Sequence, residues 1–153
     1  MTDAKSGVWV KPAFIDVHMK LYREDPDKAH FQDLRAMGVA EPVATLLLTT
    51  IGHKSGQKRT TPLNYDKVEG AYVVVASKGG WADDPLWYKN LAANPDVEVQ
   101  AGRDRFRARA RTAKDEERRR LWDHMAKVYP PYDDYAKVAP HREIPVVVLD
   151  PVG

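Results

Sequence analysis

The chain has 153 residues, a length that suits one domain with a sizeable buried core. Its 24 Lys and Arg residues and 22 Asp and Glu residues give a net charge of only +2, so any attraction to anions must be local. The absence of cysteine excludes a disulfide framework, thiolate chemistry and cysteine-ligated metal or iron–sulfur sites.

The N-terminal stretch predicts a helix rather than a targeting segment. Apolar residues recur at helical spacing between residues 8 and 22, so we expect a helix from about residue 12 to residue 23. Charged residues interrupt every apolar run there, which argues against a secretory signal and a membrane span. We therefore expect an unprocessed, cytoplasmic protein. Residues 27–42 have only weak periodicity.

The middle of the chain alternates strands with tight turns. Apolar and β-branched runs predict strands at about 44–51, 59–68 and 71–78, the last two joined at Glu69-Gly70. A helix is predicted over 85–93, with Asp84 as its N-cap and Pro85 at its first position.

The C-terminal part continues the same pattern. Residues 97–100 and 105–111 alternate with period two around Gly102, which predicts a hairpin with one polar face. An acidic first turn and an apolar stripe predict a helix over 114–127, and 144–149 predicts a buried final strand.

These elements favour one fold class. About six short strands joined mostly by tight turns predict a mainly β, α+β protein: an antiparallel barrel with helices packed around it. We expect a single domain over 1–153 with its barrel core at about 43–150. The sequence contains neither a Gly-x-Gly-x-x-Gly motif after a strand nor a Walker phosphate loop, which argues against a Rossmann or P-loop nucleotide site.

Two turns have the composition of an anion site. One follows the first strand at 52–59, and the other is Ser77-Lys78-Gly79-Gly80. Glycine lets backbone amides approach a ligand, and Lys54, Lys58 and Arg59 in the first turn and Lys78 in the second add full charges. The start of the predicted helix at 85–93 adds further amides. The alternative is that both turns are ordinary solvated hairpins.

Other patterns give weaker signals. Arginines at 103, 105, 107, 109 and 111 lie on one face of a predicted strand, but no stacking aromatic residues interleave with them. The favoured interpretation is a solvated face paired with the acidic helix start at 115–117. No nucleic-acid partner is therefore expected. The five histidines lack metal-ligand spacing, and no Gly-x-Ser-x-Gly elbow is present. The sequence therefore predicts neither a metal site nor a hydrolase.

Four segments together resemble a known family. They are the run from Leu46 to Leu63, the Val-Ala-Ser-Lys-Gly-Gly run ending at Gly80, Pro-Leu-Trp-Tyr-Lys-Asn-Leu with Asn94-Pro95, and Tyr129-Pro-Pro-Tyr132-Asp-Asp-Tyr135. In this order they resemble the deazaflavin-dependent nitroreductases, small split-barrel proteins of the FMN-binding-like superfamily that use coenzyme F420. The resemblance covers roughly residues 40–150.

The resemblance implies an oxidoreductase that passes hydride from reduced F420 to a small acceptor: a quinone, an activated enone or a nitroaromatic. It implies an acceptor site with catalytic residues Ser77, Tyr129, Tyr132 and Tyr135. It also implies a cofactor site, made of His53, Lys54, Ser55, Arg59, Thr60, Thr61, Pro62, Leu63, Asn64, Val75, Ala76, Ser77, Lys78, Leu86, Trp87, Tyr88, Lys89, Asn90 and Tyr132. His53 stands where the family usually has arginine, which removes one permanent charge from the first turn.

Alternatives remain open at this level. FMN on a related split barrel is a less favoured cofactor, and a non-catalytic carrier of deazaflavin or lipid is a further option. The N-terminal helix with Trp9 is either a lid over the pocket or a helix docked on the barrel. Peripheral contact with the inner face of the cell membrane and the oligomeric state are left open.

Overall fold

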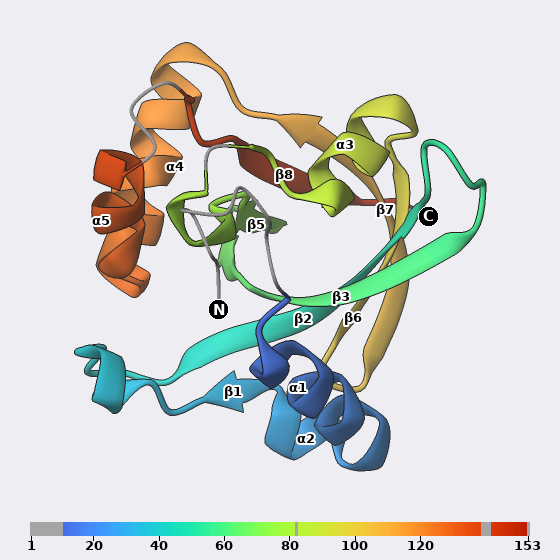
Figure 1. Cartoon of the computed structure of the whole chain (residues 1–153), viewed down its shortest axis with the longest axis horizontal. Coiled ribbons are helices and arrows are strands. Elements are labelled where there is room, and N and C mark those ends of the chain that lie inside the picture. Colours follow the sequence, from blue (N-terminus) through green and yellow to red (C-terminus); the bar gives the residue numbers. More distant parts are fainter. Residues whose placement is uncertain (1–10, 82, 139–141, 153) are drawn as a thin grey trace.

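One antiparallel sheet organises the molecule (Figure 1). The computed structural model describes residues 11–81, 83–138 and 142–152. Within this part the sheet has eight strands, in the order β1-β2-β6-β7-β8-β5-β4, with β3 paired to β2. The strands are β1 (Phe31–Gln32), β2 (Val43–Ile51), β3 (Lys58–Asn64), β4 (Asp66–Val68), β5 (Ala71–Val75), β6 (Asp96–Ala101), β7 (Asp104–Thr112) and β8 (Val146–Pro151).

Helices cover the curled sheet in separate groups (Figure 1). The first pair packs beside β1 and β3, the last pair lies on another side of the sheet, and α3 lies apart from both pairs, next to the β2–β3 hairpin. The helices are α1 (Ala13–Glu24), α2 (Pro26–Ala29), η1 (Arg35–Met37), η2 (Lys78–Gly80), α3 (Leu86–Ala93), α4 (Asp115–Val128) and α5 (Pro131–Val138).

The central strands β5 and β8 are buried on both faces, and their successive residues point to opposite sides of the sheet. In β5, Val74 joins the cluster inside the curled sheet, whereas Val73 and Val75 join a second cluster under α4 and α5. In β8, Val147 and Val148 divide in the same way. The apolar runs therefore predicted these buried strands correctly. One cluster fills the interior of the curled sheet, and the other packs α4 and α5 against its outer face.

The predicted split antiparallel barrel is confirmed, with two changes to its strands. The strand predicted over 59–68 is interrupted at Tyr65, whose side chain turns into the interior cluster, so that β3 and β4 are separate. The strand predicted over 71–78 ends at Val75, because Ser77 already has helical φ and ψ of −74° and −37° and positive φ follows at Lys78, Gly79 and Gly80. With the short β1, these changes give eight strands rather than about six.

Two of the four arginines in β7 form ion pairs, and one of them, Arg111, pairs with the acidic start of α4 as favoured from the sequence. Arg111 binds Glu117 and Asp150 at 2.6 and 3.1 Å, and Arg109 binds Asp96 at 3.2 Å. Arg103 lies in the turn before β7 and not within the strand. Among the residues described, no helix combines the length and apolarity that crossing a membrane requires.

Candidate functional site

The hairpin between β2 and β3 is held by one buried amide on α3. Asn90 is fully buried, and its Oδ1 accepts from the backbone N–H of His53 at 3.0 Å and from His53 Nδ1 at 2.7 Å. Its Nδ2 donates to Thr50 Oγ1 at 3.1 Å. Because a carbonyl oxygen only accepts, Nδ1 carries the proton in this arrangement. Asn90, which the resemblance placed in the cofactor site, therefore has its amide committed to the scaffold.

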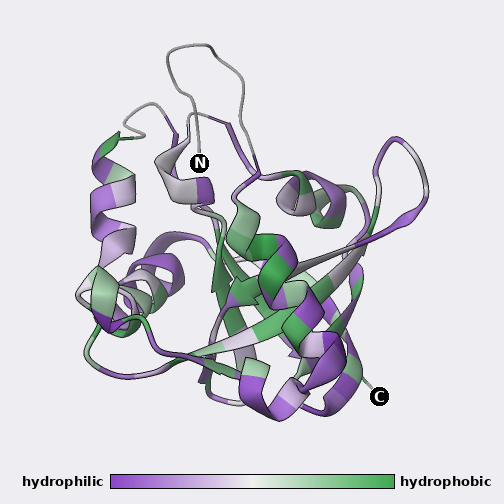
Figure 2. Ribbon diagram, turned by 60° about the horizontal axis from the view of Figure 1, so that its bottom comes forward, coloured by the Kyte–Doolittle hydropathy of each residue, from purple (hydrophilic) through white to green (hydrophobic). Residues whose placement is uncertain are grey.

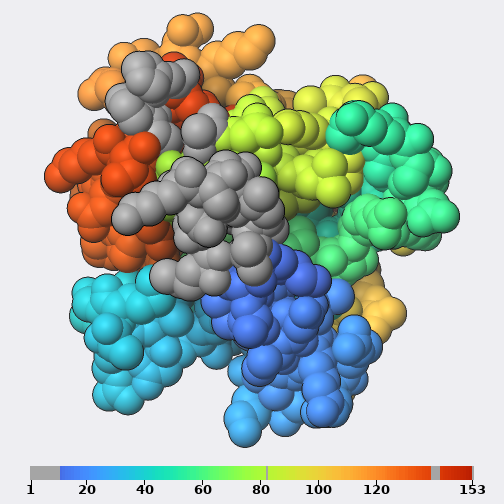
Figure 3. Space-filling view, in the orientation of Figure 1, coloured from blue at the N-terminus to red at the C-terminus, as the bar shows by residue number. Residues whose placement is uncertain are grey.

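The hairpin tip itself is exposed. His53, Lys54, Ser55 and Arg59 all face solvent, and Ser55 Oγ accepts from the N–H of Gln57 at 3.1 Å. The turn is thus preformed, with its charges on the outside. In Figure 3 it is the projection beside α3 at the right edge of the molecule.

The strand β3 runs from this tip toward the tyrosines. Thr60 is exposed, and its hydroxyl lies 2.7 Å from that of Thr49 on β2. The remaining residues of the predicted set on this strand are half-buried: Thr61, Pro62, Leu63 and Asn64. The Asn64 side chain hydrogen-bonds the Tyr132 hydroxyl, which connects the strand to α5.

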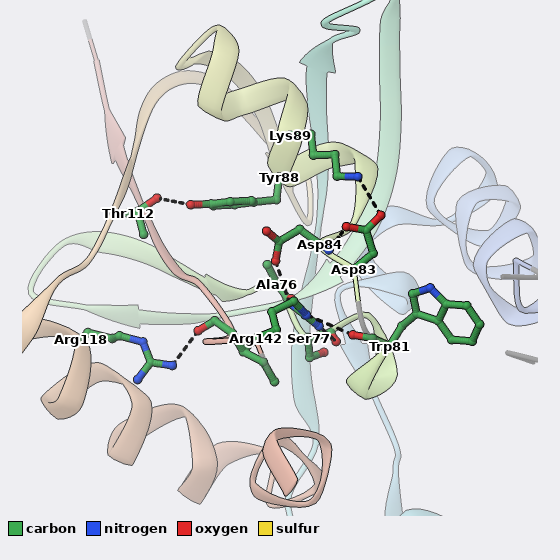
Figure 4. Close-up of polar contacts among 11 residues, drawn as sticks. Ala76, Ser77, Trp81, Asp83, Asp84, Tyr88, Lys89, Thr112, Arg118 and Arg142 are labelled. Atoms are coloured by element: carbon green, nitrogen blue, oxygen red, sulfur yellow. Dashed lines mark hydrogen bonds and ion pairs between the residues drawn. The ribbon is translucent and has the colours of Figure 1, made fainter. Parts of the chain in front are cut away.

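The loop from Ala76 to Asp84, which joins β5 to α3, is held by a residue that the sequence analysis did not single out (Figure 4). Arg142 donates to the carbonyl oxygens of Ala76, Ser77 and Trp81 at 3.0, 2.8 and 3.0 Å. It also donates to Asp84 Oδ1 at 2.8 Å. No motif marks Arg142, and its only signal is an arginine shortly before the buried strand β8.

Asp84 therefore does not cap α3 as predicted. Pro85 is the N-cap residue, no side chain caps the helix, and the Asp84 carboxylate is turned toward Arg142. The residue before Asp84 connects the loop to the helix instead, since Asp83 Oδ2 lies 2.9 Å from Lys89 Nζ on α3.

The remaining predicted residues of α3 differ in exposure. Leu86 is exposed, whereas Trp87 and Tyr88 are half-buried and pack against the interior cluster. The Tyr88 hydroxyl lies 2.9 Å from Thr112 Oγ1 on β7. These contacts orient the helix so that its first turn lies beside the loop at 76–84 (Figure 4).

The charges around this loop perturb one another. Burial lowers the pKa of Lys78, and the nearby Lys89 and Arg142 lower it further, whereas Asp83 and Asp84 oppose the shift. The Asp83 pKa is lowered, first by its hydrogen bond from Lys89. Among the described residues, three cations and two carboxylates therefore lie close together at this loop.

The three tyrosines gather on α5 and the turn before it. Tyr129 and Tyr132 are 6% and 4% exposed, whereas Tyr135 is half-buried. The hydroxyls of Tyr129 and Tyr135 lie 3.2 Å apart. Burial raises the pKa of both Tyr129 and Tyr132 well above the ordinary tyrosine value. Both therefore stay neutral at physiological pH, and Tyr135 has the most accessible side chain of the three.

The structure brings α5 against the loop at Gly80. A Cβ on Gly80 would overlap Val138 Cγ2 and would lie 2.9 Å from the Tyr135 carbonyl oxygen. The loop, α3 and the hairpin are linked through Asn90 and Lys89, and α5 adjoins them through Gly80. All four predicted segments are thus joined by hydrogen bonds, an ion pair or close contact, and β3 also reaches the tyrosines through Asn64.

Trp9, the proposed lid residue, lies outside the described residues. An open surface hollow of about 430 Å³ along α4 is lined by residues such as His124 and Arg120, and it contains none of the predicted cofactor residues. Within the described part of the chain, no three His, Asp or Glu residues are grouped closely enough to hold a metal ion.

Comparison with known proteins connects this arrangement to one family. A family model described as F420H(2)-dependent quinone reductase matches residues 15–151. An F420H(2)-dependent quinone reductase of Mycobacterium tuberculosis is 44% identical over 111 residues, which are 69% of this chain and 72% of that protein.

Solved structures agree. An F420-H2 dependent reductase superposes with a TM-score of 0.64 at 42% identity, covering 69% of this chain and 93% of that one. A structure described as a domain-swapped dimer has the same TM-score and identity, and covers 69% and 79%. The match over nearly the whole described sequence, together with these identities, shows that the chain belongs to the F420H(2)-dependent quinone reductase family.

Proposed function

We propose that the protein binds coenzyme F420 along the hairpin, the loop at 76–84 and α3, and transfers hydride from the reduced cofactor to a quinone. The observation that carries this proposal is convergence. Segments separated by up to about 40 residues, each with an anion-binding composition, are tied together by Asn90 and by the Lys89–Asp83 ion pair. Family membership supports the same cofactor.

The residues present fit such a cofactor. Exposed Lys54 and Arg59 on the hairpin suit a polyanionic tail, and the backbone amides of Ser77 and Lys78, two half-buried residues, suit the ring system. Leu86 and Trp87 offer apolar surface at the start of α3. These residues and their neighbours in the predicted set would hold the group.

When bound, the reduced deazaflavin supplies a hydride, so the protein needs neither a nucleophile nor a metal. The work left to its residues is to orient cofactor and acceptor and to exclude water. The Tyr135 hydroxyl is the best placed of the three to contact an acceptor, and the Tyr129 hydroxyl, 3.2 Å away, orients it. Tyr132 is buried and its hydroxyl is hydrogen-bonded to Asn64, so it supports the packing of α5 against β3. We include activated enones and nitroaromatics among the acceptors, as the nitroreductase resemblance implies.

Binding is the first test. Fluorescence titration should give a dissociation constant for F420 at least about tenfold below that for FMN, since basic turns on several segments suit a long polyanion better than one phosphate. Tenfold corresponds to about 1.4 kcal/mol. Equal or tighter binding of FMN would assign the protein to the alternative cofactor.

Turnover separates an enzyme from a carrier. Menadione should be reduced by the reduced cofactor, and Tyr135→Phe should lower kcat by about tenfold while leaving cofactor affinity nearly unchanged. Tyr132→Phe provides the buried comparison and should act mainly on stability. Binding without any turnover would identify a carrier, and parental kcat in Tyr135→Phe would show that solvent supplies the proton.

We further propose that the chain is one domain that contacts anionic membranes peripherally through α1. Its outward residues Phe14 and Val17 are 62% and 68% exposed, and hydrophobic and hydrophilic residues alternate along the ribbon of the helix (Figure 2). Phe14→Ser should reduce sedimentation with phosphatidylglycerol vesicles, and parental sedimentation in this variant would reject the contact. A single unfolding transition is expected for one domain.

A further inference from the structure

Arg142 is unusual among the arginines of this protein because its side chain is only 9% exposed. It comes from the segment between α5 and β8, yet all four of its recorded hydrogen bonds go to the loop between β5 and α3 (Figure 4). Only one of the four acceptors, Asp84, carries a charge. The guanidinium is therefore used chiefly to gather backbone carbonyls, which its planar fork of donors suits.

These carbonyl contacts fix the direction of the neighbouring amides. In a planar trans peptide the C=O of one residue and the N–H of the next point to opposite sides. The carbonyls of Ala76 and Ser77 point to Arg142, so the N–H groups of Ser77 and Lys78 point away from it. These are the two amides that the proposed function assigns to the cofactor ring.

The loop needs such a support because its backbone is strained. Lys78, Gly79 and Gly80 have φ values of 47°, 63° and 81°, and the non-glycine residue among them is in a region that costs about 1–2 kcal/mol. Strained backbone persists only where surrounding contacts determine it. Arg142 provides three such contacts before and after the strained residues, at Ala76, Ser77 and Trp81.

We propose that Arg142 is a positioning residue for the cofactor: it holds the loop at 76–84 so that the amides of Ser77 and Lys78 face the bound deazaflavin. Asp84 balances its buried charge at 2.8 Å. The inference rests on the proposed function for the identity of the ligand. The orientation of the loop does not depend on the ligand, and it is tested separately in the cofactor-free protein.

The test compares Arg142→Lys and Arg142→Ala with a control, Arg118→Ala. Arg118 is also partly buried, at 23% exposure of its side chain, and donates to the carbonyl of Ile144 at 2.7 Å. No hydrogen bond or ion pair joins it to the described residues of the 76–84 loop. Lysine keeps the charge but lacks the planar fork that reaches several acceptors. Both Arg142 variants should raise the dissociation constant for F420 at least tenfold, and Arg118→Ala should change it less than twofold.

Two further measurements distinguish positioning from general loosening. Hydrogen exchange of the cofactor-free protein should accelerate at Ser77–Gly80 in the Arg142 variants and remain parental in the hairpin at 52–57. Added guanidinium ion should restore part of the affinity to Arg142→Ala and none to the control. Arg142→Lys decides the matter if Arg142→Ala does not fold.

The outcomes separate the two proposals. If the parent binds F420 and Arg142→Lys binds it within twofold, Arg142 does not position the cofactor, and the proposed function stands. If the parent does not bind F420, the proposed function fails. Parental hydrogen exchange in the loop of the Arg142 variants would overturn the support role whatever the ligand.

Discussion

Two turns of similar composition, the hairpin at 52–57 and the loop at 76–84, are held in different ways. The hairpin is exposed and is tied to α3 at one point, the side chain of Asn90. The loop is half-buried, contacts α5 at Gly80 and is fixed at four acceptors by Arg142. Glycine, lysine and serine thus mark a turn without revealing how firmly it is held.

This difference indicates separate roles for the two turns in cofactor binding. Exposed charges on a hairpin act at a distance and are screened by salt, so they suit attraction of a charged tail. Backbone amides in a fixed loop act only at contact and need their geometry set in advance, so they suit orientation of a ring. Substitutions in the loop should therefore change mainly the stability of the protein, whereas substitutions of the charged hairpin residues should change mainly the salt-dependent affinity for the cofactor.

The largest effect is expected at Gly80. Gly80→Ala adds a Cβ at 2.9 Å from the Tyr135 carbonyl oxygen and forces alanine to φ 81°. The combined overpacking and backbone strain should cost about 3–5 kcal/mol of unfolding free energy. Urea denaturation followed by circular dichroism measures the loss.

Gly56→Ala is the matched control in the hairpin. Gly56 has a similar φ of 72°, but an added Cβ would meet nothing within 4 Å. Only the backbone strain remains, about 1 kcal/mol. Equal losses in the two variants would show that the loop is no more constrained than the hairpin, which would remove the basis of the comparison.

The next effect concerns the single anchor of the hairpin. Asn90→Ala leaves the backbone N–H and Nδ1 of His53 without their acceptor and removes a buried donor to Thr50. We expect a loss of about 2–3 kcal/mol in unfolding free energy. Hydrogen exchange should accelerate in the hairpin and not in the loop.

Asn94→Ala is the control for a less buried asparagine. Its Oδ1 accepts one long hydrogen bond, 3.3 Å from the N–H of Asp96, so the loss should be well below that of Asn90. If exchange in the hairpin stays parental in Asn90→Ala, the turn is stable by itself and the anchor is unnecessary.

The architecture was largely predictable because it depends on local patterns. Continuous apolar runs in β5 and β8 specify strands that are buried on both faces. The acidic start with the apolar stripe specified α4 to within one residue at each end. The strand ends were less predictable. Positive φ at Lys78 is set by contacts made elsewhere in the chain, and no local rule marks a lysine for it.

The supports of the site were the least predictable part. Arg142 lies 65 residues beyond Ser77, and Asn90 lies 37 residues beyond His53. Both contacts join segments that are far apart in sequence. Arg142 lies in no motif, and the motif that contains Asn90 indicated a cofactor contact rather than an anchor. Asp84 shows the same limit, because its position before Pro85 predicts a cap whereas a distant guanidinium takes its carboxylate.

A smaller effect is expected for the exposed charges of the hairpin. Lys54→Ala and Arg59→Ala should each weaken F420 binding by about 1 kcal/mol at low salt, because both side chains face solvent. The difference from the parent should disappear as salt rises. Lys67→Ala, on the exposed face of β4, is the control. Unchanged affinity at low salt in both hairpin variants would make this turn an ordinary solvated hairpin.

The smallest effect is the pH dependence contributed by Lys78. Burial, with help from Lys89 and Arg142, places its folded-state pKa below the unfolded value of 10.5. Between these two values the unfolded chain binds more protons, so this group makes the native state more stable as pH rises. For an anionic ligand the sign reverses, because the ammonium that attracts it is lost in the same window.

As the pH rises, the affinity for F420 should therefore begin to decrease before pH 10.5 is reached. The expected decrease is about 0.5 kcal/mol for one partly screened contact. Lys78→Arg keeps its charge throughout this range and should flatten the profile, since the arginine pKa lies above about 12. Lys54→Arg makes the same change in the exposed hairpin and controls for the guanidinium itself. Flattening in Lys54→Arg, with an unchanged slope in Lys78→Arg, would place the titrating cation in the hairpin and reverse the assignment of the two turns.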